Sequence, residues 1–171
     1  MEIFLRFLVK SRGRIASAAK TCYNRSISSA LGQDGGTGPD GEEERMLGIE
    51  EYKRVVAELT DELPEEFFRD LTGGVIVSEA RVLPDYARAN DLYTMGEYQV
   101  TAGMRQIVMF KGSFDRVYPE ADAAEARELL RGILRHEFRH HLEAMGGIHN
   151  SSSLEAEDER QKQAYLASHE K

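Results

Sequence analysis

The chain has 171 residues, a mass of 19.3 kDa and a formal net charge of −8. This length suits one compact domain. The net negative charge argues against general nucleic-acid binding, because phosphate contacts need clustered Lys and Arg. No apolar run reaches the roughly eighteen residues of a membrane span. The single cysteine, Cys22, excludes an intrachain disulfide and a Cys-rich zinc site, so we expect a protein of the reducing cytoplasm.

The first 45 residues differ in composition from the rest. Six basic residues and one acid fall between Met1 and Gln33, and Gly32 to Arg45 has the composition of a linker. We therefore expect residues 1–45 to be a disordered, basic and Gly-rich extension outside the fold, and residues 46–171 to form the domain. The Arg- and Ser-rich character is that of an organellar transit peptide, but translation from an upstream start codon, with Met46 as the alternative start, explains it as well and is the interpretation we favour.

The next hundred residues predict two helical segments and then strands. Apolar residues at helical spacing predict a helix over 49–59, followed by a short helical turn entered at Pro64. A β-branched run bounded by a proline predicts a strand over 75–83. Residues 85–100 are ambiguous, with a short strand after Gly96, and 105–114 is the clearest strand pattern in the chain.

A long helix is expected over Ala123–Met145. Asp122 and Glu125 form a capping box at its start, and a pair of glycines follows its end. At roughly 100° per residue, one side of this helix carries both polar and apolar residues: Ala126, Leu129, Ile133, His136, Glu137 and His140. Because this is the side we expect to pack on the sheet, the polar trio points inward, where an unpaired glutamate would be costly.

The trio forms the pattern His136-Glu137-x-x-His140. Histidines four apart on a helix can bring two imidazole nitrogens to one zinc ion, and the glutamate between them can take the proton of a metal-activated water. The structural alternative is a pair of core histidines with Glu137 in an ion pair. We favour one Zn²⁺ per chain, and interpret His141, at the edge of the same side, as supporting or packing.

A catalytic zinc needs a third protein ligand. A capping box of Ser152 and Glu155 predicts a helix from about Ser153 to Ala167, and on it Asp158 shares a face with apolar residues. We predict Asp158 as the third ligand, with Glu155 and then Glu159 as alternatives. A solvated first turn explains the other acids of this run, and we expect His149, which lies in a Gly, Asn and Ser loop, to be exposed. The HExxHxxGxxH pattern of metzincins is absent.

From Ile49 to Tyr165 the chain resembles the small prokaryotic zincin-like metallopeptidases, a minimal zincin family. Four pieces carry the resemblance, of which the HExxHH piece is the specific one: Glu62–Phe67, Val75–Val77, Gln106–Phe114 and His136–His141. In shorter family members an Asp-Glu pair soon follows HExxHH, and by similarity Asp158 and Glu159 take that place. This chain departs from the pattern by carrying "LEAMGGIHNSSSLEAE" in between.

The resemblance implies an α+β zincin-like fold in which the HExxH helix packs on a small mixed sheet. It also implies that an extended substrate pairs with the strand from Gln106 to Lys111 as the sheet edge, with a core strand as an equal alternative. The predicted function is zinc-dependent hydrolysis of peptide bonds in a peptide or protein substrate, with Glu137 as general base. Tyr165, Arg139 and His149 are candidates to stabilise the oxyanion.

Two other functions stay open. The first is a metal-binding regulatory or protein-interaction module that turns nothing over, and the second is a helical structural protein without metal. We favour the enzyme, because a purely structural zinc site normally uses four protein ligands and gives little reason for a glutamate between the histidines.

Overall fold

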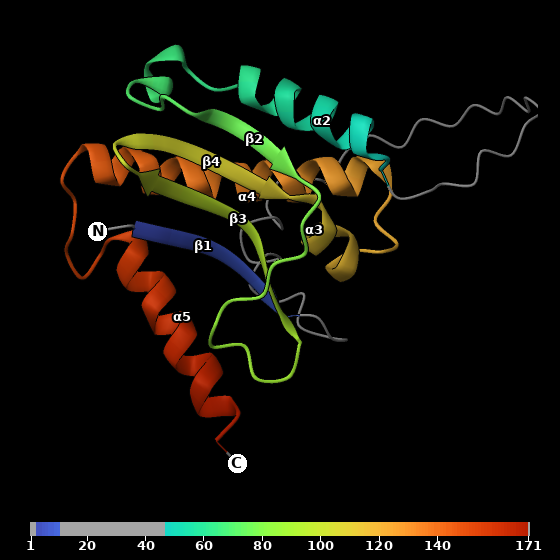
Figure 1. The fold of residues 1–171 in the computed structure, drawn as a ribbon, viewed down its shortest axis with the longest axis vertical. Coiled ribbons are helices and arrows are strands. Elements are labelled where there is room, and N and C mark those ends of the chain that lie inside the picture. Colours follow the sequence, from blue (N-terminus) through green and yellow to red (C-terminus); the bar gives the residue numbers. More distant parts are fainter. Residues whose placement is uncertain (1–2, 11–46, 171) are drawn as a thin grey trace, which may run out of the picture.

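The computed structural model describes residues 47–170 and the backbone of residues 3–10. These form an α+β fold with one four-stranded mixed sheet, in the order β1-β3-β4-β2. Figure 1 shows the sheet with the long helix α4 running across it. Among the described residues, no helix combines the length and the apolarity needed to cross a membrane.

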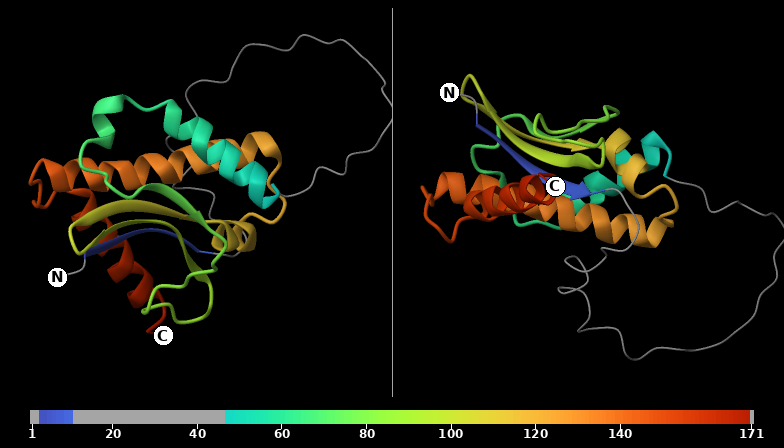
Figure 2. Two further views of the ribbon diagram at one scale, coloured as in Figure 1. Left: turned by 45° about the horizontal axis from the view of Figure 1, so that its top comes forward. Right: turned by 90° about the horizontal axis from the view of Figure 1, so that it is seen from below.

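Two helical segments open the described range 47–170. Helix α2 spans Ile49–Asp61, and a 3₁₀ turn, η1, spans Glu65–Phe68 after Pro64. The predicted apolar spacing is confirmed, since Tyr52, Val55, Val56 and Leu59 are buried. Figure 2 shows α2 beside α4 on one face of the sheet.

The sheet combines antiparallel and parallel pairs. Strands β2 (Gly74–Ser78), β3 (Leu92–Thr101) and β4 (Met104–Phe110) follow these helices, with β3 and β4 inside the sheet and β2 at one of its edges. The β3–β4 pair is a hairpin closed by Ala102 and Gly103, both with positive φ, as a two-residue turn requires. Strand β2 pairs with β4 in parallel, so β4 lies between two strands. The prediction that Gln106–Lys111 is an edge strand is therefore wrong, and the core-strand alternative is confirmed.

Strand β1 (Ile3–Lys10) pairs antiparallel with β3 and forms an outer edge of the sheet. The prediction that residues 1–45 lie outside the fold is thus wrong for residues 3–10, while residues 11–45 lie outside the described residues. The physical reason is twofold. The sequence "IFLRFLVK" is rich in residues that favour strands, and the entropic cost of closing the long connection to β3 rises only slowly with its length.

Three predicted strand boundaries differ from the structure. The strand predicted over 75–83 ends at Ser78, whose hydroxyl accepts a hydrogen bond from the N–H of Ala80 and so supports a turn. Strand β3 begins at Leu92 and runs through Gly96, not after it. The strand predicted over 105–114 ends at Phe110, where helix α3 (Lys111–Val117) begins without a loop, supported by an i,i+4 ion pair between Lys111 and Asp115.

The main core lies between the sheet and the helices. On the sheet it is built from Tyr98, Ile107 and Met109, and on α4 from residues that include Ile133 and Leu134. Phe138, on another side of α4, packs edge-to-face on Phe68 with ring centroids 5.1 Å apart. Helix α4 therefore buries residues against η1 as well as against the sheet.

Candidate metal centre

Helix α4 spans Ala123–Met145, as predicted, and it carries two of the three candidate ligands. The Asp122 side chain caps it by accepting the N–H of Glu125, and Gly146 and Gly147 end it. With the helix geometry fixed, the i,i+4 spacing brings the Nε2 atoms of His136 and His140 to 3.1 Å from each other. Both imidazoles present the same ring nitrogen to one point.

Helix α5 (Leu154–Ser168) brings Asp158 to that point. Its N-cap is Ser153, whose hydroxyl accepts the N–H of Ala156, so the predicted Ser152 cap is wrong by one residue. A second contact fixes the start of α5 on α4, because the N–H of Leu154 donates to Glu143 over 2.7 Å. The turn between the helices therefore sets where the Asp158 carboxylate lies.

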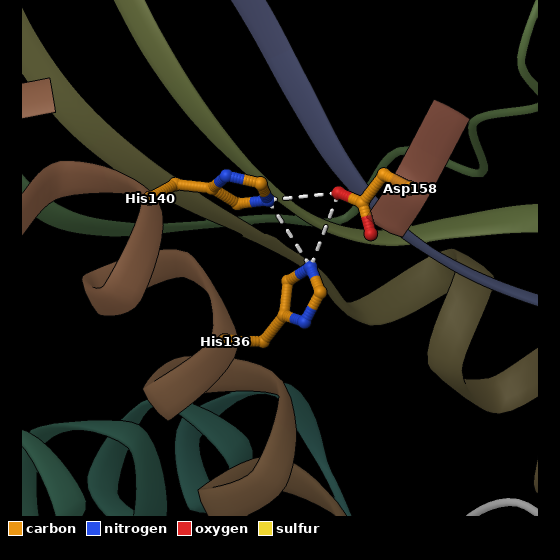
Figure 3. Close-up of side chains that lie close together, drawn as sticks. All are labelled: His136, His140 and Asp158. Carbon is orange, nitrogen blue, oxygen red and sulfur yellow. Dashed lines mark hydrogen bonds and ion pairs between the residues drawn. The ribbon is translucent and has the colours of Figure 1, made fainter. Parts of the chain in front are cut away.

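The three side chains form a compact triangle, shown in Figure 3. Asp158 Oδ2 lies 2.9 Å from His140 Nε2 and 3.4 Å from His136 Nε2. Zinc bonds of about 2.0–2.1 Å at tetrahedral angles place neighbouring ligand atoms about 3.3 Å apart, so the triangle has nearly the size that a tetrahedral zinc would require. Among the described residues, this is the group of three or more His, Cys, Asp or Glu side chains that could hold a metal ion.

Burial differs around the triangle. The His140 side chain is 1% exposed, whereas those of His136 and Asp158 are 15% and 17% exposed. One side of the triangle therefore faces solvent, as a catalytic site with an open coordination position needs. Burial acts to raise the pKa of the Asp158 carboxyl, but the hydrogen bonds to His136 and His140 outweigh it, so that this pKa lies below its ordinary value. Asp158 is thus an anion at neutral pH, as a metal ligand must be.

Glu137 points into the interior beside the sheet. It is fully buried, and its Oε2 accepts the backbone N–H of Tyr98 on β3 over 2.9 Å. The carboxylate fits there because β3 has a glycine at the contact: a Cβ on Gly96 would lie 2.9 Å from the Glu137 Cγ and 3.1 Å from its Oε1. Gly96 and the Tyr98 N–H form what we call the Glu137 seat.

His141 joins the Glu137 seat to the loop after η1. Its Nε2 lies 2.9 Å from the carbonyl oxygen of Arg69, and its Nδ1 lies 3.3 Å from the Tyr98 hydroxyl. Since a carbonyl only accepts, Nε2 carries the proton and Nδ1 accepts from the tyrosine. Burial lowers the pKa of His141, which favours this neutral form. The predicted packing role of His141 agrees with this position.

The other candidates from the sequence lie outside the triangle. Glu155 is exposed and faces His149 at 3.7 Å, while Glu159 pairs with Lys162. Arg139 donates to Glu143. Tyr165 donates its hydroxyl to Asp91 and accepts the N–H of Arg88. Of the predicted ligands, the structure thus brings together His136, His140 and Asp158.

Sequence reasoning missed the Glu137 seat. Gly96 gave a usable signal, because a glycine inside a strand often marks a close approach by another part of the molecule. The N–H of Tyr98 gave none, since every residue except proline has one, and only the strand pairing determines where it points.

Comparisons with known proteins find similarity among solved structures. No protein-family model matches the chain, and no curated protein matches it. Among solved structures, a conserved hypothetical protein from T. thermophilus is similar, with 27% sequence identity and a TM-score of 0.50. The match covers 58% of this chain and 98% of that one, so that nearly the whole of the shorter protein corresponds to part of this fold. Its name assigns no activity, and the likeness therefore concerns the architecture.

Proposed function

We propose that this protein is a zinc-dependent metallopeptidase with a zincin-like fold. The observation that carries the proposal is the convergence of His136, His140 and Asp158, from two helices, into a triangle of zinc-site dimensions. A glutamate next to the first histidine, on a helix packed against a small mixed sheet, adds the group that peptide hydrolysis requires.

The ligand chemistry suits zinc better than the harder cations. Two neutral imidazoles and one carboxylate are ligands of catalytic zinc, whereas magnesium and calcium prefer sites made of oxygen atoms. When bound, zinc would supply a Lewis acid that lowers the pKa of water and polarises a carbonyl group. One carboxylate among the ligands leaves that ion less electrophilic than three imidazoles would.

Glu137 would act as the general base and then as the general acid. Its carboxylate would take the proton of the attacking water and return it to the leaving amine. Both steps need a carboxylate in a fixed position, and the hydrogen bond from the Tyr98 N–H holds one of its oxygens. The substrate class is a peptide or protein segment.

Metal content tests the first half of the proposal. We expect about one zinc per chain, measured by mass spectrometry on protein purified without a histidine tag. His140→Ala and Asp158→Asn should each lose it. Glu155→Gln is the matched control, since it removes an acid one turn earlier on the same helix and should keep the metal. The proposal would be wrong if wild-type protein contained no zinc after purification and bound none when zinc was added.

Glu137→Gln tests the second half. The variant keeps an oxygen that can accept the Tyr98 N–H, so we expect an intact fold, full zinc content and cleavage of a mixed peptide library lowered by at least about a hundredfold.

A metal-binding module without turnover is the second candidate, and one observation favours it. The Glu137 carboxylate is turned toward the backbone of β3 and is fully buried. On this alternative, wild type and Glu137→Gln bind zinc equally and neither cleaves any peptide of the library.

A further inference from the structure

Strand β1 covers an edge of the sheet that would otherwise be open. It runs antiparallel along β3, from the pair Ile3 and Val100 to the pair Lys10 and Leu92, while β4 pairs with the opposite side of β3. Without β1, this side of β3 would present unpaired N–H and C=O groups, which can accept any extended peptide.

This edge lies beside the residues of the proposed function. Strand β3 supplies the N–H that Glu137 accepts, and β1 contacts both α4 and α5, the helices that carry the three candidate ligands. Figure 3 shows the β1 ribbon passing near the segment of α5 that carries Asp158. A peptide that pairs with β3 at this edge would therefore run close to the metal triangle.

The register also indicates which peptide would fit. Arg6 stands opposite Glu97, a buried acid on β3 whose carboxylate accepts a hydrogen bond from Gln99. Apart from Arg6 and Lys10, the strand "IFLRFLVK" is apolar. Opposite charges directly across two strands favour pairing, so the edge suits an extended apolar segment with a basic residue at this position.

We propose that Ile3–Lys10 is an internal occupant of a peptide-binding edge on β3, and that an extended apolar peptide with a basic residue opposite Glu97 binds by displacing it. Because β1 belongs to the same chain, its pairing is independent of protein concentration, and an external peptide has to compete with it. Displacement of β1 does not depend on the proposed function, whereas the consequence that β1 restrains cleavage rests on it.

The test uses the full chain, with β1 either cross-linked to β3 by a disulfide (the lock) or weakened in its pairing (the opened variant). For the lock, Ile3→Cys and Val100→Cys are combined in a Cys22→Ser background. Facing residues of antiparallel strands have Cα atoms about 4.5–5.5 Å apart, within the reach of a disulfide. Lys10→Cys with Val100→Cys is the mismatched control, because the partner of Lys10 is Leu92, eight residues or roughly 26 Å along β3 from Val100.

The opened variant is Leu5→Pro, since a proline in mid-strand removes a donor and disfavours pairing. The readout is the binding of a fluorescein-labelled octapeptide with the sequence of residues 3–10, followed by fluorescence anisotropy. We expect the matched pair to cross-link and the mismatched pair not to. We expect the Leu5→Pro chain to bind the peptide at least tenfold more tightly than the oxidised lock, and reduction of the lock to restore wild-type binding. The same peptide with glutamate in place of arginine should bind at least fivefold more weakly.

Three outcomes would overturn the proposal: a matched pair that cross-links no better than the mismatched one, a locked chain that binds as well as Leu5→Pro, or equal binding of the arginine and glutamate peptides. Failure of the proposed function would look different, because zinc or cleavage would be missing while the ranking of peptide affinities stayed as described.

Discussion

Two glycine-to-alanine substitutions should change stability in opposite directions, although the chemical change is the same. Gly96 on β3 faces α4, and an added Cβ would lie 2.9 Å from the Glu137 Cγ and 2.9 Å from the Ile133 Cγ2. Gly132 lies inside α4, and an added Cβ there would meet nothing within 4 Å. The pair therefore isolates the effect of close packing from the general effect of replacing glycine.

The magnitudes follow from these contacts. Contacts below 3.0 Å force α4 and β3 apart, and overpacking of this kind costs about 1–3 kcal/mol. Alanine restricts the unfolded chain and gains roughly 0.4–1 kcal/mol wherever the backbone accepts it, and neither glycine has a positive φ. We thus expect Gly96→Ala to lower the free energy of unfolding by about 1–2 kcal/mol and Gly132→Ala to raise it by up to about 1 kcal/mol.

Urea unfolding followed by circular dichroism measures both changes, with equal m-values as the check that two-state comparison is valid. If Gly96→Ala were as stable as Gly132→Ala, the close contact between β3 and the Glu137 side chain would be refuted. Gly96→Ala should also lose peptide cleavage while it retains zinc, since the added methyl meets Glu137 and Ile133 and not a candidate ligand.

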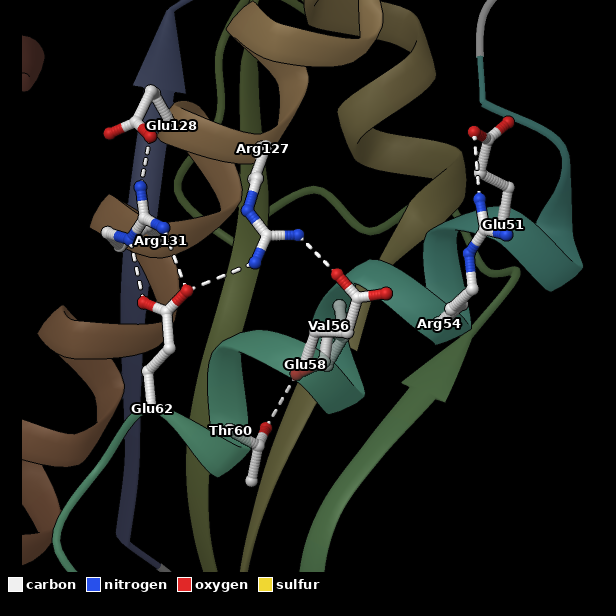
Figure 4. A network of polar contacts seen from close by, with 9 residues as sticks. All are labelled: Glu51, Arg54, Val56, Glu58, Thr60, Glu62, Arg127, Glu128 and Arg131. Carbon is white, nitrogen blue, oxygen red and sulfur yellow. Dashed lines mark hydrogen bonds and ion pairs between the residues drawn. The ribbon is translucent and has the colours of Figure 1, made fainter.

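Two further predictions concern the surface network and pH. Figure 4 shows that Arg131 donates two hydrogen bonds to the Glu62 carboxylate, whereas Arg54 makes one contact with Glu51. The Arg131 side chain is 22% exposed and that of Arg54 is 66% exposed. Arg131→Ala should therefore lower the urea midpoint several times more than Arg54→Ala, and 1 M salt should shrink the difference; equal losses would contradict the reasoning. Because burial lowers the pKa of His141 in the folded state, the unfolded chain takes up a proton first as pH falls below about 6.5, and wild type should lose stability there more steeply than His141→Gln. Urea midpoints at pH 7.5 and 5.5 in the presence of a chelator measure this, and parallel losses would count against it.

The long helix and the convergence of His136, His140 and Asp158 could be predicted because their signals are local. The Asp122 cap, the apolar period and the terminal glycines fix α4, and the spacing of four residues then decides where His136 and His140 point. Asp158 followed from the face it shares on the next helix. Each of these inferences depends on residues that are close in the sequence.

The parts that were missed depend on contacts between distant residues. Gly96 interrupts the local strand pattern, yet β3 runs through it because α4 approaches there. The order of the strands places β4 in the middle of the sheet, which no feature of its own sequence determines. The same holds for β1, whose partner lies about ninety residues away in the chain.

Helix α5 is fastened near its two ends, with Asp158 between them. Leu154 and Tyr165 are its buried residues; the first donates its N–H to Glu143 on α4, and the second joins the loop that contains Asp91. An ion bound by residues of both helices would depend on both contacts, since they hold the Asp158 ligand in place. Substitutions at Tyr165, outside the triangle, should therefore accelerate metal release without changing any ligand.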